Sequence, residues 1–327
     1  MKNIPVFITH AGCKNDCVFC NQKIITGQSY DECKTREIIE FYLSRTKTNA
    51  NTEIAFFGGS FTGLEKGAMI NLLEIAREYI DKYRLAGVRL STRPDYITQE
   101  ILDILLKYKV KNIELGIQSM FDDVLNACNR GCTAADCENA CKIISLTGID
   151  LTGQIMLGLP ESNRVKDAAT AERLAELGIK FARIYPAVIL RDTELYNMYE
   201  RGEYAPVSLD EAVCRAKEIK KIFDARDIKI LRMGLCSSEN INLTDCIGPY
   251  HPAFGELVSS ELFYDRLCKD LAEINSRDII IETAKKNISK IIGQGRKNIV
   301  RFEGKFSKSI KIVEDNDIKE EYNIRIG

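Results

Sequence analysis

No apolar run in this 327-residue sequence is long enough to cross a membrane. The first residues also lack the basic segment and apolar stretch that mark a secretory signal peptide. We therefore expect neither a membrane anchor nor a leader, and we predict a cytoplasmic protein. Hydrophobic residues make up 45% and charged residues 28%, the proportions of an ordinary globular chain. This length suffices for one α/β barrel-type domain with a small appendage.

A large net charge is missing as well. The sequence has 46 Lys and Arg and 47 Asp and Glu, which gives a formal charge of −1. The chain as a whole therefore has no nucleic-acid signature. The charge is unevenly distributed, however. Between Lys285 and Lys311, nine Lys or Arg stand against one acid, Glu303. We call these residues the basic region. Such an excess is expected where a protein contacts a phosphate backbone, and a solvated charged face is the alternative.

The twelve cysteines do not indicate a disulfide framework, since the chain is neither small nor secreted; a reducing cytosol and metal binding suit them better. Cys13, Cys17 and Cys20 follow the apolar run Ile4–Ile8 with the spacing C-x3-C-x2-C. Three thiolates on a tight loop can hold three irons of a 4Fe-4S cluster and leave the fourth iron open. Structural zinc sites and ferredoxin motifs need four ligands, so neither pattern fits.

This cysteine motif, with the aromatic Phe19 before its last cysteine, resembles the signature of the radical S-adenosylmethionine (SAM) enzymes. The similarity is greatest to the branch containing the catalytic subunit of Elongator, a tRNA wobble-uridine modifying enzyme. The resemblance implies that Cys13, Cys17 and Cys20 ligate the cluster and that the open iron binds SAM. It further implies reductive cleavage of SAM to a 5′-deoxyadenosyl radical, an electron donor such as flavodoxin or ferredoxin, and a backbone contact from Phe19 to the adenine.

Short apolar runs alternate with amphipathic helical patterns six times up to about Pro186, which predicts a parallel sheet with right-handed crossovers. We expect an α/β fold, a partial (β/α)6 radical SAM barrel, with a C-terminal α+β accessory region. The expected domains are the barrel at 1–207, a helical extension packing on it at 208–277, and a basic appendage at 278–327. The expected strands are Ile4–Ile8, Glu53–Phe57, Val88–Thr92, Asn112–Ile117, Leu151–Leu157 and Ala182–Tyr185, and the helices between them are Lys34–Arg45, Gly67–Tyr83, Thr98–Tyr108, Asp136–Thr147 and Lys166–Leu177.

The loops after the second and third strands carry candidate site residues, because chemistry in such folds sits at the carboxyl ends of the strands. Gly58 and Gly59 let a ligand approach the backbone closely. They lie where the superfamily binds the SAM amino group with a GGE motif, and Ser60 replaces the acid, as in the Elongator-like branch. Arg93 belongs to a Ser-Thr-Arg-Pro-Asp string shared with that branch. It is either a SAM-site residue or half of a structural salt bridge.

Two further candidates, Gln118 and Arg130, follow the fourth strand. They match positions at which the related oxygen-independent coproporphyrinogen oxidases contact SAM. Gln118 can hydrogen-bond ribose hydroxyls or a carboxylate, and Arg130 can pair in bidentate fashion with the methionine carboxylate. No residue stands out as a general base or a radical quencher.

Two other groups of cysteines invite a second metal site. One contains Cys128, Cys132, Cys137 and Cys141, whose spacing along a mostly helical segment does not converge on one metal, so we expect buried thiols. The other contains Cys236, Cys246 and His251 in an irregular loop, where a zinc or iron site would still lack a fourth ligand.

Within the basic region, Gly293-Gln294-Gly295-Arg296 is reminiscent of the GxxG loop of KH domains, although Arg296 stands in place of the second glycine. This favours RNA, specifically tRNA, as the substrate of a radical SAM enzyme. The alternatives are a radical SAM enzyme acting on a small molecule or peptide, and a non-catalytic iron–sulfur module. No acetyltransferase segment follows, so we do not expect acetyl-CoA-dependent carboxymethylation within this polypeptide.

Overall fold

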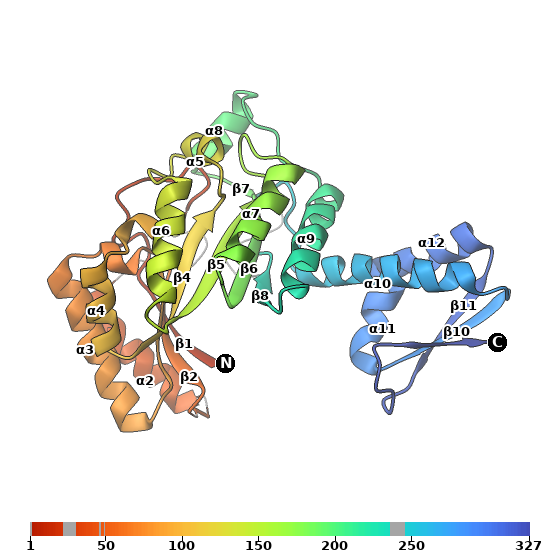
Figure 1. Ribbon diagram of the computed structural model, residues 1–327, viewed down its shortest axis with the longest axis horizontal. Helices are drawn as coiled ribbons and strands as arrows, with labels where there is room; N and C mark the ends of the chain where they lie inside the picture. Colours follow the sequence, from red (N-terminus) through yellow and green to blue (C-terminus); the bar gives the residue numbers. More distant parts are fainter. Residues whose placement is uncertain (1, 22–30, 46, 49, 236–245) are drawn as a thin grey trace. The chain divides into compact units, whose positions relative to one another are not determined.

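The computed structural model describes residues 2–21, 31–45, 47–48, 50–235 and 246–327 (Figure 1). The chain divides into two compact units, Met1–Pro252 and Ala253–Gly327, which we call unit 1 and unit 2. We describe each unit by itself. None of the helices in the described ranges is both long enough and apolar enough to pass through a bilayer.

Unit 1 contains a seven-stranded sheet whose neighbouring strands are all parallel, in the order β1-β2-β3-β4-β5-β6-β8. The predicted partial barrel is confirmed, and β8 adds a strand to the six that were expected. The strands are β1 Lys2–Phe7, β2 Thr52–Phe57, β3 Gly87–Thr92, β4 Val110–Gln118, β5 Asp150–Leu157, β6 Phe181–Pro186 and β8 Lys229–Met233.

The crossover helices lie along one face of this sheet (Figure 1). Alternate strand residues such as Ile54, Phe56 and Leu90 are completely buried, because they face this layer of helices. Several helices begin at side-chain caps, including Thr98, whose hydroxyl accepts the Ile101 N–H. The helices of unit 1 are α2 Thr35–Arg45, α3 Lys66–Tyr83, α4 Gln99–Lys107, α5 Asp122–Ala127, α6 Ala134–Ser145, α7 Arg164–Glu176, α8 Glu194–Glu200 and α9 Leu209–Asp224; a small antiparallel pair joins β7 Ile189–Leu190 to β9 Cys246–Ile247.

The other face of the sheet carries a buried polar layer. Arg89 on β3 is 1% exposed, and its Nε donates to Glu53 Oε2 at 2.8 Å. Its Nη1 donates to Asn112 Oδ1 at 2.8 Å, and the Thr152 hydroxyl donates to the same oxygen at 2.9 Å. These residues come from four neighbouring strands, so ion pairing and hydrogen bonding join the strands where a hydrophobic core might be expected.

Unit 2 has its own sheet and core. Its sheet has the order β11-β10-β12, with β10 and β11 parallel and β12 antiparallel to β10. Phe263, Leu267, Ile281, Ile299 and Phe302 are buried together in one cluster. The elements are α10 Phe254–Glu273, β10 Asp278–Thr283, α11 Lys285–Ile292, the short helix η5 Gln294–Arg296, α12 Lys297–Phe306, β11 Ser309–Glu314 and β12 Asn323–Ile326.

The division of the chain differs from the predicted boundaries after residues 207 and 277. Helix α9 and strand β8 belong to unit 1, since β8 pairs in parallel with β6 and extends the sheet. Helix α10 belongs to unit 2, because its apolar residues Leu267 and Leu271 pack in the same core as Ile279 and Ile281. The helix was expected to pack on the barrel. Its amphipathic pattern showed that one face is buried but did not identify the partner.

Candidate active site at the carboxyl edge of the sheet

The three cysteines of the C-x3-C-x2-C motif lie on the loop after β1. Cys13 is exposed, and Cys17 and Cys20 are half-buried. Within the described part of the chain, no three Cys, His, Asp or Glu side chains converge as they would around a single metal ion. A 4Fe-4S cluster places each cysteine on a different iron, so its ligands need not meet at one point.

The cysteine loop is held against the Gly58–Gly59 turn after β2. The His10 N–H donates to Gly58 O at 3.0 Å, and the Ser60 N–H donates to Ala11 O at 2.9 Å. The approach is so close that a Cβ on Gly59 would lie 2.4 Å from Ile8 O. Glycine is therefore required at this position, because any side chain would push the two loops apart.

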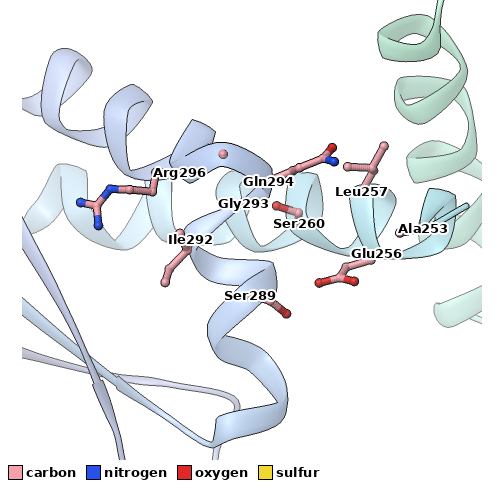
Figure 2. A pocket seen from close by; sticks show the side chains of 10 residues that line it. Ala253, Glu256, Leu257, Ser260, Ser289, Ile292, Gly293, Gln294 and Arg296 are labelled. Carbon is pink, nitrogen blue, oxygen red and sulfur yellow. The ribbon is translucent and has the colours of Figure 1, made fainter. Parts of the chain in front are cut away.

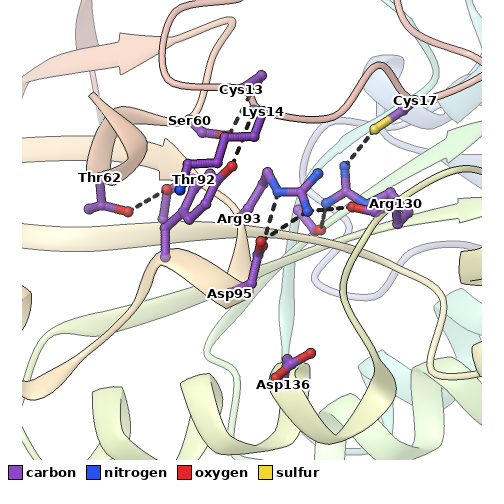
Figure 3. A network of polar contacts seen from close by, with 12 residues as sticks. Cys13, Lys14, Cys17, Ser60, Thr62, Thr92, Arg93, Asp95, Arg130 and Asp136 are labelled. Atoms are coloured by element: carbon purple, nitrogen blue, oxygen red, sulfur yellow. Dashed lines mark hydrogen bonds and ion pairs between the residues drawn. The ribbon is translucent and has the colours of Figure 1, made fainter. Parts of the chain in front are cut away.

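Ser60 faces the cysteine loop rather than an open cavity. Its side chain is 2% exposed, and its Oγ lies 3.3 Å from Cys13 Sγ (Figure 3). The hydroxyl that replaces the superfamily's acid thus contacts a predicted cluster ligand in this structure. A contact from Ser60 to SAM stays a prediction.

The turn after α5 contacts the cysteine loop from the side of β4. Asn129 Nδ2 donates to Asp16 O at 2.9 Å, and Arg130 Nη1 donates to Cys17 Sγ at 3.2 Å (Figure 3). Gly131 adopts φ +66°, and a Cβ there would lie 2.4 Å from Asn15 Nδ2. Residues more than a hundred positions apart in the sequence therefore form one edge of the site.

Arg130 is a buried cation, and one of its three guanidinium nitrogens has no hydrogen-bond partner among the described residues. It is 5% exposed, and its Nη2 donates to Gly116 O at 2.5 Å. Burial opposes the charge, but the neighbouring thiols of Cys17 and Cys132 raise the pKa of Arg130, so the guanidinium stays protonated. Its Nε has no hydrogen-bond partner among the described residues.

Gln118 ends β4 in a strained conformation. Its φ is +69°, in the left-handed region, where the register between β4 and β5 shifts. Such a backbone costs about 1–2 kcal/mol for a residue other than glycine and is often found at functional sites. The side chain is 4% exposed, and its Oε1 is unpaired in the described structure. A Cβ on Gly116 would lie 3.1 Å from Gln118 Nε2 and 3.4 Å from Arg130 Nη2, so both side chains converge over this glycine.

Arg93, which follows β3, forms the salt bridge that was predicted as one of two alternatives. Its Nε and Nη2 donate to the two Asp95 oxygens at 2.9 and 3.0 Å. Nη2 also donates to Arg130 O (Figure 3). Arg93 therefore positions the backbone of Arg130. Its Nη1, buried and unpaired within the described ranges, stays available to a ligand.

Phe19 lies at the inner side of the cysteine loop. It is partly buried against a cluster that includes Val124, Leu159 and Leu195. The loop backbone beside it is fixed, since the Val18 N–H donates to Cys128 O at 3.2 Å and the Leu195 N–H donates to Val18 O at 2.7 Å. The predicted backbone contact of Phe19 with an adenine stays a prediction.

The four cysteines after β4 are buried thiols, as expected. Cys128, Cys132, Cys137 and Cys141 are at most 4% exposed. The Cys137 thiol hydrogen-bonds to Cys132 and lowers the pKa of Cys132 to about 7 although burial opposes this, with Arg130 adding to the effect. In the second suggested group, Cys236 lies outside the described residues, and Cys246 belongs to strand β9.

Sequence reasoning missed a charged cluster on the polar face of the sheet. Glu114 on β4 pairs with Arg183 on β6 at 2.8 Å, and Arg183 lies over the Phe57 ring at 5.3 Å. Burial raises the pKa of Glu114, although Arg183 and Arg89 oppose the shift. A signal was present in the sequence: a charged residue inside a buried strand needs a partner of opposite charge, here two strands away in the same sheet.

Comparisons with known proteins agree with this arrangement. A model of the radical SAM superfamily matches residues 7–184, and a model of the radical SAM C-terminal domain matches residues 179–264. The tRNA uridine(34) acetyltransferase of Methanocaldococcus jannaschii is 30% identical over 135 residues, 40% of this chain and 25% of that protein. Elongator complex protein 3 of Saccharomyces cerevisiae is 30% identical over 133 residues, 40% of this chain and 24% of that protein. The chain thus matches about a quarter of the length of these two relatives.

Solved structures share the fold. The archaeal Methanocaldococcus infernus Elp3 has a TM-score of 0.61 at 20% identity, covering 83% of this chain and 64% of that one. The coproporphyrinogen III oxidase of Escherichia coli, a radical SAM enzyme, has a TM-score of 0.51 at 18% identity, covering 69% of this chain and 52% of that one.

Proposed function

Because this chain belongs to the radical SAM superfamily of enzymes, with a barrel similar to that of the Elongator catalytic subunit, we propose that it is a SAM-cleaving enzyme that modifies RNA, specifically tRNA. The observation that carries the SAM site is the convergence of Gln118 and Arg130 over Gly116, next to Cys17. Both side chains present buried polar atoms that have no partner in the described structure. Such atoms are costly unless a ligand completes their hydrogen bonds.

Residues of the carboxyl edge fit the two cofactors. Cys13, Cys17 and Cys20 would hold a 4Fe-4S cluster, since these thiols lie on one tight loop and form no disulfide. When bound, the cluster supplies the electron for the reductive cleavage of SAM to a 5′-deoxyadenosyl radical. A protein donor such as flavodoxin or ferredoxin would deliver that electron.

The protein's own residues bind and orient SAM in this proposal. Arg130 Nε would pair with the SAM carboxylate, and Gln118 Oε1 would accept a ribose hydroxyl. Gly58 and Gly59 leave backbone groups accessible to the SAM amino group, with Ser60 beside them. Phe19 would contact the adenine through its backbone. Arg93 would hold the Arg130 turn in place and direct Nη1 toward SAM.

RNA is the proposed substrate because two kinds of observation agree. The relatives at 30% identity carry names that refer to tRNA uridine 34 and to Elongator. Unit 2 adds the basic region, in which Lys285, Lys286, Arg296 and Lys297 are exposed. We place the reaction in the cytoplasm, where tRNA is available.

The test is release of 5′-deoxyadenosine by anaerobically reconstituted, reduced protein given SAM, with and without total tRNA. We expect release that tRNA accelerates. Release that tRNA does not change would contradict the RNA substrate and favour a small molecule or peptide. No release from reduced, iron-loaded protein would contradict SAM cleavage itself.

A pair of cysteine variants tests the cluster site. We expect Cys17→Ala to lose most bound iron, because one of three ligands is removed. Cys33→Ala is the matched control, since Cys33 is an exposed free cysteine outside the motif. Equal iron content in the two variants, measured after the same reconstitution, would contradict the assignment.

A further inference from the structure

Unit 2 contains a pocket between the first half of α10 and the turn that joins α11 to α12 (Figure 2). Its volume is about 420 Å³, within the range of about 300–1,000 Å³ that ligand sites occupy. The half-buried Leu257 and Ile292 provide apolar walls. Polar groups from Glu256, Ser289 and Gln294 also line it. The pocket thus combines two aliphatic side chains with several hydrogen-bonding groups.

The walls of this pocket are fixed by buried Asn298 at the start of α12. Asn298 is 1% exposed, and its Nδ2 donates to Ser260 O at 3.1 Å and to Ser260 Oγ at 2.9 Å. Its Oδ1 accepts from Arg301 Nη1, which also pairs with Glu261 at 2.6 Å. These bonds fasten the first turn of α12 to α10, so the pocket is held open by the fold.

The rim of the pocket is an open glycine turn. Gly293 has φ +76° and ψ 156°, a conformation essentially restricted to glycine. Gly295 and Arg296 both have left-handed backbones, with φ of +60° and +62°. A Cβ on Gly295 would meet no described heavy atom within 4 Å. A ligand can therefore approach this backbone closely, as glycine turns at ligand sites permit.

The charge around the turn favours an anion. Arg296 and Lys297 are exposed beside the pocket, and α12 begins without an acidic residue in its first turn. The backbone N–H groups of Arg296 and Lys297 already donate to Gly293 O and Gln294 O, so contacts to a phosphate would come from the basic side chains. Not all of the basic region takes part: Arg301 pairs with Glu261, and the Lys308 ammonium donates to the carbonyls of Ile274 and Ser276.

We propose that this pocket binds one unpaired base of single-stranded RNA, with the adjoining phosphates over the Gly293–Lys297 turn. The base would stack on Leu257 and Ile292. The Glu256 carboxylate would accept from an exocyclic amino group, which cytosine and adenine have and uracil lacks. The proposal rests on the proposed function only in its choice of RNA as the polymer.

The experiment measures the affinity of iron-loaded, full-length protein for fluorescent single-stranded RNA, without SAM. Gly295→Asp adds a negative charge where the backbone is open, and Asp tolerates a left-handed conformation. Gly295→Asn is the matched control, because Asn has the same shape without the charge. We expect the Asp variant to bind about tenfold more weakly or worse and the Asn variant to bind within about twofold of the parent. Equal affinity of the Asp and Asn variants would overturn the phosphate site.

The base preference is a separate readout. We expect oligocytidylate and oligoadenylate to bind about fivefold or more tightly than oligouridylate of the same length, and Glu256→Gln to reduce that difference. Equal binding of all three oligomers would overturn the base pocket. Because no SAM is present, failure of 5′-deoxyadenosine release would contradict the proposed reaction and leave this binding result unaffected.

Discussion

Two arginine–glutamate pairs in unit 1 have similar geometry and very different surroundings. Arg89 and Glu53 lie 2.8 Å apart with side chains 2% and 4% exposed, and Arg36 and Glu78 lie 2.6 Å apart with 48% and 61% exposed. Arg89→Met leaves a buried carboxylate without its cation, so we expect the free energy of unfolding to fall by about 3–5 kcal/mol. Arg36→Met should cause no measurable loss, because water solvates the remaining charge. Urea unfolding of both variants makes the comparison, and equal losses would contradict it.

Arg130 provides the second prediction, concerning ligand affinity. Lysine would keep the charge of Arg130 but could not donate to Cys17, to Gly116 and to a carboxylate from one planar group. We expect Arg130→Lys to weaken SAM binding about tenfold or more, measured by equilibrium dialysis on iron-loaded protein. Arg173→Lys is the control, since Arg173 forms a partly exposed pair with Glu138 away from the site. Unchanged affinity in Arg130→Lys would remove Arg130 from the SAM site.

Side chains of the site were predictable from sequence to different degrees. Cys13, Cys17 and Cys20 are visible because the ligand function proposed for them requires a short spacing. Arg89 and Glu53 were not anticipated, because their pairing joins positions 36 residues apart and depends on strand register. The contact of Ser60 with Cys13 likewise spans 47 residues and depends on how two loops meet.

The close contact between the cysteine loop and the Gly58–Gly59 turn predicts that a side chain added at Gly12 would disturb the cysteine loop. Gly12 has φ +75°, and a Cβ there would lie 2.1 Å from Ser60 O. Gly148 has a similar φ of +78°, but its Cβ would meet no described heavy atom within 4 Å. Both alanine variants carry the same backbone strain, of about 1–2 kcal/mol. Only Gly12→Ala should also separate the two loops. We expect it alone to lose iron after reconstitution, and equal iron retention would contradict this reading.

Helices and strands of the barrel were predicted to within about two residues, because parallel strands and crossover helices differ clearly in apolar periodicity. Helix α12 and the position of strand β8 in the sheet were not predicted. Helix α12 was missed, since its ten residues are interrupted by Gly304 and carry three basic side chains. Strand β8 was not recognised as the seventh strand of the sheet, because its sequence does not specify its neighbour.

The chain divides into two compact units, and unit 2 has a core of its own, which predicts two unfolding events. Phe302 is completely buried in the cluster of unit 2. We expect Phe302→Ala to cost unit 2 about 3–5 kcal/mol and to lower the melting temperature of one calorimetric transition only. SAM affinity, which depends on unit 1, should not change. A single transition that shifts as a whole would contradict independent units.

The buried thiols after β4 should differ from the exposed cysteines in their reactivity toward alkylating reagents. Alkylating reagents should modify solvent-facing Cys13 and Cys33 within the folded chain, while Cys128, Cys132, Cys137 and Cys141 stay protected until the barrel opens. Mass spectrometry of alkylated peptides would then report unfolding of unit 1 without any engineered probe. A preparation in which the proposed cluster has been lost to air but the barrel is kept would be recognised by the same pattern: the motif thiols are modified or oxidised and the four buried ones remain intact.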